Sequence, residues 1–78
     1  MHAEYTFNLE KLLSFENAET IIANCKRILS VESNNANAYY WIGIAQYYIN
    51  HKQQAFENLT KSKQLGQELA SIFIFENF

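Results

Sequence analysis

The chain has 78 residues, a net charge of −2 and a hydrophobic content of 49%. This length allows one small domain over residues 1–78, and the absence of Pro, with only two Gly and one Val, disfavours strands and predicts an all-α fold. The weakly negative charge and the scattered basic residues exclude a general electrostatic grip on nucleic acid or on an anionic membrane surface.

Two helices are predicted in the N-terminal half. The first covers about Ala3–Ser14 and the second covers Ala18–Val31, because apolar side chains recur there every three or four residues along one stripe. Asn17 is expected to be the N-cap of the second helix, since its side-chain oxygen can accept a hydrogen bond from a backbone N–H of the first turn. The run Ser33–Asn35 is expected to form a turn and to cap the helix that follows.

The third predicted helix, from about Asn37 to Ile49, is apolar on nearly every side. Such a helix is normally buried all round, so we expect neighbouring elements and a partner to cover it. A tight turn at Ile49–Lys52 leads into a fourth helix, Gln53–Leu65. Its inward residues are expected to be Ala55, Phe56, Leu59 and Leu65. Gly66 then ends the helix, because glycine adopts the left-handed conformation common at helix ends.

The tail, residues 67–78, predicts a C-terminal helix that is apolar on more than one side. Its apolar residues are Leu69, Ile72, Phe73, Ile74, Phe75 and Phe78. A bare Ile-Phe-Ile-Phe run is an aggregation hazard, so we expect either a partner protein or a second copy to shield it.

The stretch from Asn35 to Gly66 contains a set of residues at characteristic helical spacing. In chain order, they are Tyr39, Ile42, Gly43, Ala55 and Leu59. This spacing resembles the tetratricopeptide repeat, whose signature is an aromatic residue, a Leu-Gly pair, a later alanine and a large residue after it. The match needs no gap, although Gln46, Ser62 and Gln67 stand where the family has an aromatic residue, an alanine and a proline.

The resemblance implies antiparallel helix pairs. Residues 36–66 form one repeat, and a shift of 34 residues places a degenerate first repeat over about residues 2–35. The C-terminal helix would then be the capping helix of the stack, which usually has a polar outer face. In this alignment the small residues Gly43 and Ala55 lie where the paired helices cross, so that their backbones can approach closely.

No sequence pattern assembles a catalytic, cofactor or metal site. A nucleophile-plus-base interpretation would pair Cys25 with His51. However, Cys25 lies on the apolar stripe of the second helix, where a buried structural thiol is the simpler interpretation. His51 lies in a turn, and no second cysteine or paired histidine supplies metal-ligand spacing. We therefore expect no enzymatic activity and no cofactor.

Protein binding is the function that the sequence favours. The resemblance places several residues of the third helix on the groove-lining face of the repeat, and the apolar tail adds others. The predicted partner-binding residues are Asn37, Tyr40, Ile44, Tyr47, Tyr48, Leu69, Ile72 and Phe73. A tyrosine-rich, lysine-poor groove suits an apolar helix or extended segment better than an acidic peptide terminus.

Two hypotheses follow for the biological role. The first is an adaptor or chaperone that masks an apolar segment of a partner, and the resemblance suggests, as a narrower version, the small tetratricopeptide chaperones of bacterial type III secretion. The second is a scaffold that self-associates through its C-terminal helix. The single cysteine, the lack of an N-terminal signal and the lack of a long apolar run predict a cytoplasmic protein without a membrane span.

Overall fold

Four helices follow one another in the computed structural model, which describes residues 15–78. They are α2 (Phe15–Val31), α3 (Ala36–Tyr48), α4 (Lys52–Gln64) and α5 (Glu68–Asn77). Residues 15–78 otherwise contain only turns, which confirms the all-α prediction for this part of the chain. The predicted first helix, Ala3–Ser14, lies outside the described residues.

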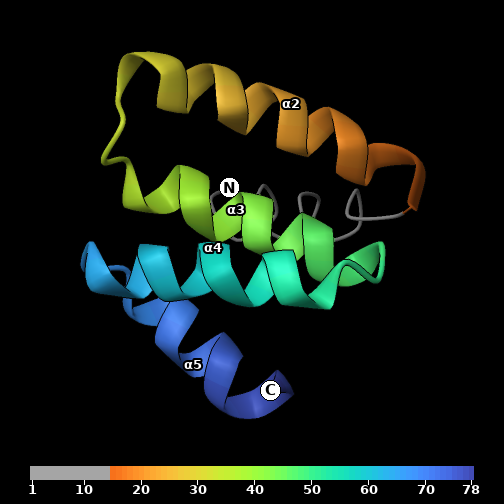
Figure 1. Ribbon diagram of the computed structural model, residues 1–78, viewed down its shortest axis with the longest axis vertical. Coiled ribbons are helices and arrows are strands. Elements are labelled where there is room, and N and C mark those ends of the chain that lie inside the picture. The colour runs from red at the N-terminus through yellow and green to blue at the C-terminus, as the bar shows by residue number, and fades with distance from the viewer. Residues whose placement is uncertain (1–14) are drawn as a thin grey trace, which may run out of the picture.

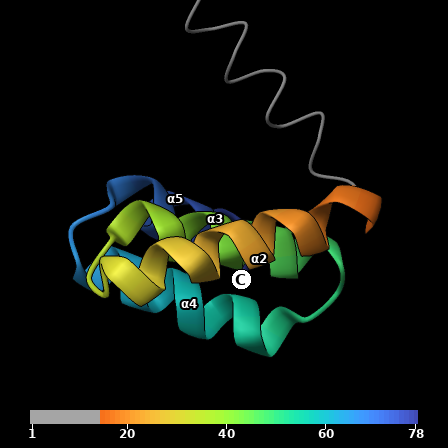
Figure 2. The ribbon, with the colours of Figure 1, turned by 90° about the horizontal axis from the view of Figure 1, so that it is seen from above.

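The helices stack in chain order (Figure 1). α3 packs between α2 and α4, and α5 packs on α4 at the far end of the stack. Viewed from above, α2 lies over α3, while α4 and α5 are displaced toward opposite sides (Figure 2). None of the helices in this part of the chain combines the length and the apolar character that a membrane span requires.

α2 begins earlier than the sequence predicts. Its helical residues start at Phe15, so Asn17 lies within the first turn and the prediction that it caps the helix is wrong. Phe15 and Glu16 already have helical backbone, and an N-cap residue lies before the first helical residue, so Asn17 is too far along the chain to cap this helix. The predicted apolar stripe is confirmed at Cys25, which is buried, and at Ile21, Ile22 and Leu29, which pack against the core. Its remaining predicted residue, Ile28, is 43% exposed, so the prediction is wrong there.

α3 is the most buried helix of the described chain. Its N-cap is Asn35, whose Oδ1 accepts a hydrogen bond from the backbone N–H of Ala38 at 2.9 Å, as predicted for the capping cluster. Six of its residues are buried: Ala38, Ile42, Gly43, Ile44, Ala45 and Gln46. A helix without a polar stripe is stable here because other helices cover more than one of its sides.

The α3–α4 and α4–α5 connections use the same helix-ending geometry. Asn50 has φ +68° and Gly66 has φ +104°, so both lie in the left-handed region. The backbone N–H of Asn50, and likewise that of Gly66, donates to the carbonyl oxygen three residues earlier. The backbone N–H of the residue that follows each of them donates to the carbonyl oxygen five residues earlier. These paired bonds define a Schellman motif, which satisfies the last carbonyls of each helix.

α3 and α4 cross at a glycine. A Cβ atom built on Gly43 would lie 2.5 Å from Leu59 Cγ and 3.2 Å from the Ala55 carbonyl oxygen, so a side chain at position 43 has no room. Two polar residues are also buried at this crossing. Ser62 Oγ donates to the Ala36 carbonyl at 2.7 Å, and Gln46 Oε1 accepts from Asn58 Nδ2 at 2.7 Å. The predicted close approach is confirmed.

α4 differs from the prediction at one inward residue. Ala55 and Leu59 are fully buried, as expected, but Phe56 is 44% exposed. The reason is its angular position: Ala55, Leu59 and Ser62 form the stripe that faces α3, and Phe56 lies at the edge of this stripe, toward the end of α5.

Gly43→Ala is expected to destabilise the fold by up to about 2 kcal/mol. Replacing glycine with alanine inside a helix normally stabilises it by about 1 kcal/mol, but overpacking against Leu59 costs about 1–3 kcal/mol. Urea denaturation followed by circular dichroism measures the change. A stabilised Gly43→Ala variant would show that α3 and α4 do not approach each other this closely.

Candidate protein-binding surface

The eight predicted binding residues fall into buried, half-buried and exposed groups. Ile44 is only 4% exposed and belongs to the core cluster with Ala45, Leu59 and Ala70. The structure therefore does not offer its side chain to a partner, because α3 is covered on that side by its neighbours. Tyr40 is half-buried against the same core, and its ring packs edge-to-face on Trp41 with centroids 5.2 Å apart.

Asn37 is exposed, but its side chain has an intramolecular partner. Its Oδ1 accepts a hydrogen bond from Gln67 Nε2, and Gln67 in turn caps α5 by accepting from the backbone N–H of Leu69 at 3.1 Å. This link joins the start of α3 to the start of α5. Asn37 thus helps to position α5, and its Oδ1 atom is already used within the chain and is less available to a partner than the sequence suggests.

Aromatic rings gather where α3, α4 and the end of α5 meet, and we call this group the aromatic cluster. Its members are Tyr47, Tyr48, Phe56, Phe73 and Phe78. Tyr47 is at the centre: its ring centroid lies 6.2 Å from Tyr48, 5.2 Å from Phe73 and 5.5 Å from Phe78, in edge-to-face geometry. Lys52 Nζ lies 5.2 Å from the same centroid, at cation–π distance.

Two members of the aromatic cluster were not predicted as site residues. Phe78 packs on Phe56 with ring centroids 5.3 Å apart, yet the two side chains are 49% and 44% exposed. Tyr48 is 55% exposed beside them. The cluster is therefore a partly open apolar surface. The contact between Phe78 and α4 could not be predicted from helical periodicity, and the high aromatic content of the tail was the only sequence signal for it.

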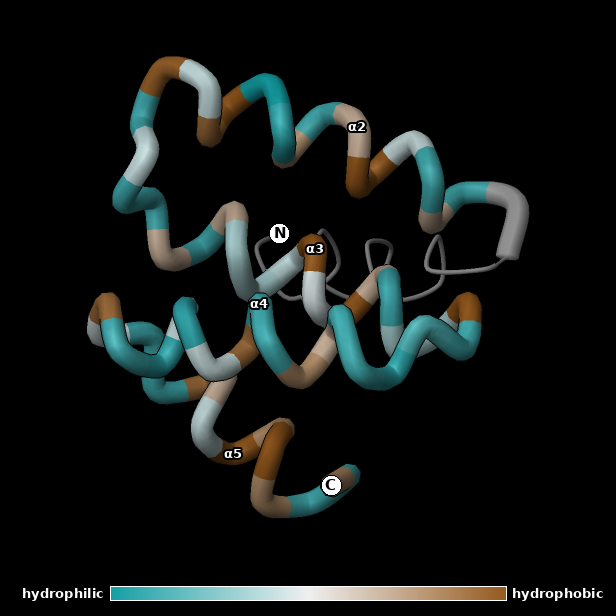
Figure 3. The backbone as a smooth tube through the Cα atoms, viewed as in Figure 1, coloured by the Kyte–Doolittle hydropathy of each residue, from teal (hydrophilic) through white to brown (hydrophobic). Residues whose placement is uncertain are grey.

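The outward side of α5 carries a second apolar surface, which we call the outer stripe. It consists of Leu69, Ile72 and Phe75, with exposed fractions of 53%, 52% and 89%. The hydropathy colouring shows apolar residues along α5, in contrast to the largely hydrophilic α4 beside it (Figure 3). Leu69 and Ile72 were predicted as binding residues, and the structure places both on this surface together with Phe75.

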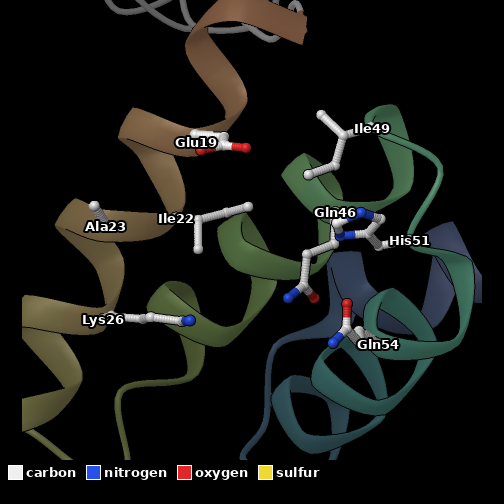
Figure 4. Close-up of a pocket in the computed structure, with 8 residues that line it drawn as sticks. All are labelled: Glu19, Ile22, Ala23, Lys26, Gln46, Ile49, His51 and Gln54. Atoms are coloured by element: carbon white, nitrogen blue, oxygen red, sulfur yellow. The ribbon is translucent and has the colours of Figure 1, made fainter.

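A groove of about 370 Å³ lies between α2 and the α3–α4 connection. Side chains of α2 line one side of it, and residues from the end of α3 and the start of α4 line the other (Figure 4). Its lining residues are Glu19, Ile22, Ala23, Lys26, Gln46, Ile49, His51 and Gln54. The Gln46 Oε1 atom is already bonded to Asn58. The sequence did not predict this groove.

The structure does not bring Cys25 and His51 together. Cys25 packs with Ala38 and Ile42, which lie in the first half of α3. His51 follows the opposite end of α3 and lines the groove, in which Cys25 takes no part. Burial raises the pKa of the Cys25 thiol above its ordinary value. A buried thiol with a raised pKa is a poor nucleophile, because the thiolate is the reactive form.

Comparison with known proteins leaves the family open: no family model, curated protein or solved structure matches this chain. Within residues 15–78, no three metal-ligating side chains are gathered in a way that could hold a metal ion.

Cys25 is expected to react slowly with iodoacetamide in the native protein. At pH 8 its alkylation should be at least ~10-fold slower than in urea, because the folded chain both buries the sulfur and disfavours the thiolate. Mass spectrometry of timed samples measures the two rates. Equal rates would contradict the burial of Cys25 in the α2–α3 interface.

Tyr47→Ala is expected to destabilise the fold by about 2–3 kcal/mol, and Tyr48→Ala by less than about 1 kcal/mol. Tyr47 contacts Phe73 and Phe78 and joins α5 to α3, whereas Tyr48 is largely exposed. Chemical denaturation of both variants gives the comparison. Equal effects would show that Tyr47 does not hold α5 in place.

Proposed function

We propose that this chain is a non-catalytic protein-binding module, an adaptor or chaperone that covers an apolar helix or segment of another protein. The observation that supports this most directly is the outer stripe of Leu69, Ile72 and Phe75, three large apolar side chains more than half exposed on one short helix. Contiguous exposed apolar surface on a small domain commonly marks an interaction site.

The location of the outer stripe adds to the argument. α5 uses its other side to pack on the fold, through Ala70, Phe73 and Ile74. The apolar residues on its outward side are therefore not needed to hold α5 in place. Covering them with a partner gains about 25 cal/mol for each Å² of apolar surface removed from water.

The aromatic cluster extends the apolar surface beyond α5. Tyr48, Phe56 and Phe78 are each between 44% and 55% exposed, and they lie at the end of α5 where the helix meets α3 and α4. Tyrosine and phenylalanine provide large contact areas with few rotatable bonds, which lowers the entropic cost of binding. We infer that a partner segment contacts the outer stripe and continues onto this cluster.

The tetratricopeptide resemblance supports the same function. The antiparallel pair α3–α4, with Gly43 and Ala55 at the close crossing, is what a repeat over residues 36–66 requires. α5 then takes the place of the capping helix, but with an apolar outer side instead of the polar one that ends a repeat array. A terminal helix of this kind suits a module whose stack is completed by a partner.

A self-associating scaffold is the second candidate function, since a second copy could also cover the outer stripe. Light scattering over a dilution series separates the two candidates. A monomer of 9.1 kDa at all concentrations favours a module for another protein. A dimer that Phe75→Glu dissociates favours the scaffold.

The binding function is tested with a 14-residue amphipathic helical peptide that has leucines on one face, glutamines and serines elsewhere, and no charge. Titration into the ¹⁵N-labelled chain is expected to shift amide signals of α5 and the aromatic cluster. Phe75→Glu should weaken binding at least ~10-fold, or about 1.4 kcal/mol, because it places a charge within the apolar contact.

Val31→Glu is the matched control, since Val31 is also apolar and 83% exposed but lies at the end of α2. It should leave the affinity unchanged. An absence of any peptide-induced shift, or equal weakening by both substitutions, would overturn the proposed function.

A further inference from the structure

The outer side of α5 combines its apolar stripe with two carboxylates. Glu68, Ile72 and Glu76 are spaced four residues apart, so they form one row along the helix surface. Leu69 and Phe75 lie on either side of this row at helical spacing. Both glutamates are exposed, and the Cα atoms of Glu68 and Glu76 lie about 12 Å apart at 1.5 Å per residue. The surface is thus apolar in the middle and acidic at both ends.

This charge pattern restricts what can cover the surface. α5 contains two acidic residues and no basic one. An occupant that buries Ile72 and Phe75 also brings its own flanking residues close to Glu68 and Glu76. Basic residues there form favourable pairs, whereas acidic residues repel, and such pairs at the rim of an interface govern partner choice and association rate.

The same pattern disfavours a second copy as the occupant. A two-fold dimer through α5 pairs the helix with itself, usually in antiparallel orientation. With Ile72 at the centre, Glu68 of one copy would lie opposite Glu76 of the other. In a parallel pair, each glutamate would lie beside its own equivalent. Either arrangement places like charges next to each other around the apolar contact.

We propose that the outer stripe of α5 binds an amphipathic helix of another protein that has Lys or Arg residues two turns apart at the two ends of its apolar stripe. This inference rests on the proposed binding function and specifies the chemistry of the partner. Apolar contact with Leu69, Ile72 and Phe75 provides affinity, and the pairs to Glu68 and Glu76 select and orient the partner helix.

Two fluorescein-labelled peptides test the proposal. Both have the same leucine stripe on a 14-residue amphipathic helix, but one has lysines and the other glutamates at the two flanking positions. Fluorescence anisotropy with the full chain in low salt is expected to give at least ~10-fold tighter binding of the lysine peptide. In 0.5 M NaCl the ratio should fall toward one, because salt screens exposed charges.

The double substitution Glu68→Lys/Glu76→Lys is expected to reverse this preference in favour of the glutamate peptide. Glu19→Lys/Glu57→Lys is the matched control. It changes the net charge equally but alters exposed residues of α2 and α4, so it should retain the preference for the lysine peptide. Glu68 also lies in the first turn of α5, where a negative charge stabilises the helix. Glu68→Gln/Glu76→Gln is therefore measured too and should abolish the preference without introducing repulsion.

Each result has a distinct meaning. Equal affinities of the two peptides for the unmodified chain would overturn the charge-selective partner and leave the binding function intact. The charge-selective partner would also be overturned if Glu19→Lys/Glu57→Lys reversed the preference for the lysine peptide as strongly as Glu68→Lys/Glu76→Lys. Binding of neither peptide, together with failure of the uncharged peptide, would overturn both proposals. A dimer that Phe75→Glu dissociates would identify a second copy as the occupant and would overturn this inference.

Discussion

The close approach of α3 and α4 at Gly43 is the constraint on which the other helices depend. Leu59 is fully buried there, and its Cγ atom lies only 2.5 Å from the position that a Cβ atom on residue 43 would take. Because the two backbones approach this closely, α2 can pack on the far side of α3 while α5 packs on α4, and one cluster joins buried residues of all four helices.

Polar contacts make this arrangement specific. Gln46 and Ser62 are both buried, and each has a hydrogen-bond partner on the facing helix. An unpartnered buried amide or hydroxyl costs about 1–3 kcal/mol, so sliding α4 along α3 would lose these bonds as well as the packing. The bonded trio of Asn37, Gln67 and the Leu69 amide extends this alignment to α5.

The sequence predicts the described helices well but assigns their faces only where polar and apolar residues are segregated. Most of the α2 stripe and the inward Ala55 and Leu59 of α4 were correctly predicted, because the opposite sides of these helices are polar. α3 and α5 lack such a division, so periodicity could not show that Ile44 is buried or that Phe75 is 89% exposed.

The misplaced residues have local causes: helical structure at Phe15 and Glu16 extends past the expected cap Asn17, and Phe56 lies at the border of two faces. The aromatic cluster depends on tertiary contacts between Tyr47, Phe73 and Phe78, which sequence spacing does not contain.

One side of α5 packs on the fold and the other is exposed, and this difference decides how the proposed binding would affect the fold. Ala70 is the only fully buried residue of α5, so the helix is held mainly by half-buried contacts of Phe73 and Ile74 and by its cap. A partner on the outer stripe does not compete with these contacts, since it uses the opposite side of the helix. A ligand shifts an equilibrium only toward the state that it binds more tightly, so a partner that contacted the outer stripe alone would not favour the docked position of α5. The proposed partner would also contact the aromatic cluster, which α3, α4 and the end of α5 form together, and would therefore raise the free energy of undocking α5. The helix with the fewest buried residues in the described chain would then be the one whose attachment the proposed partner strengthens.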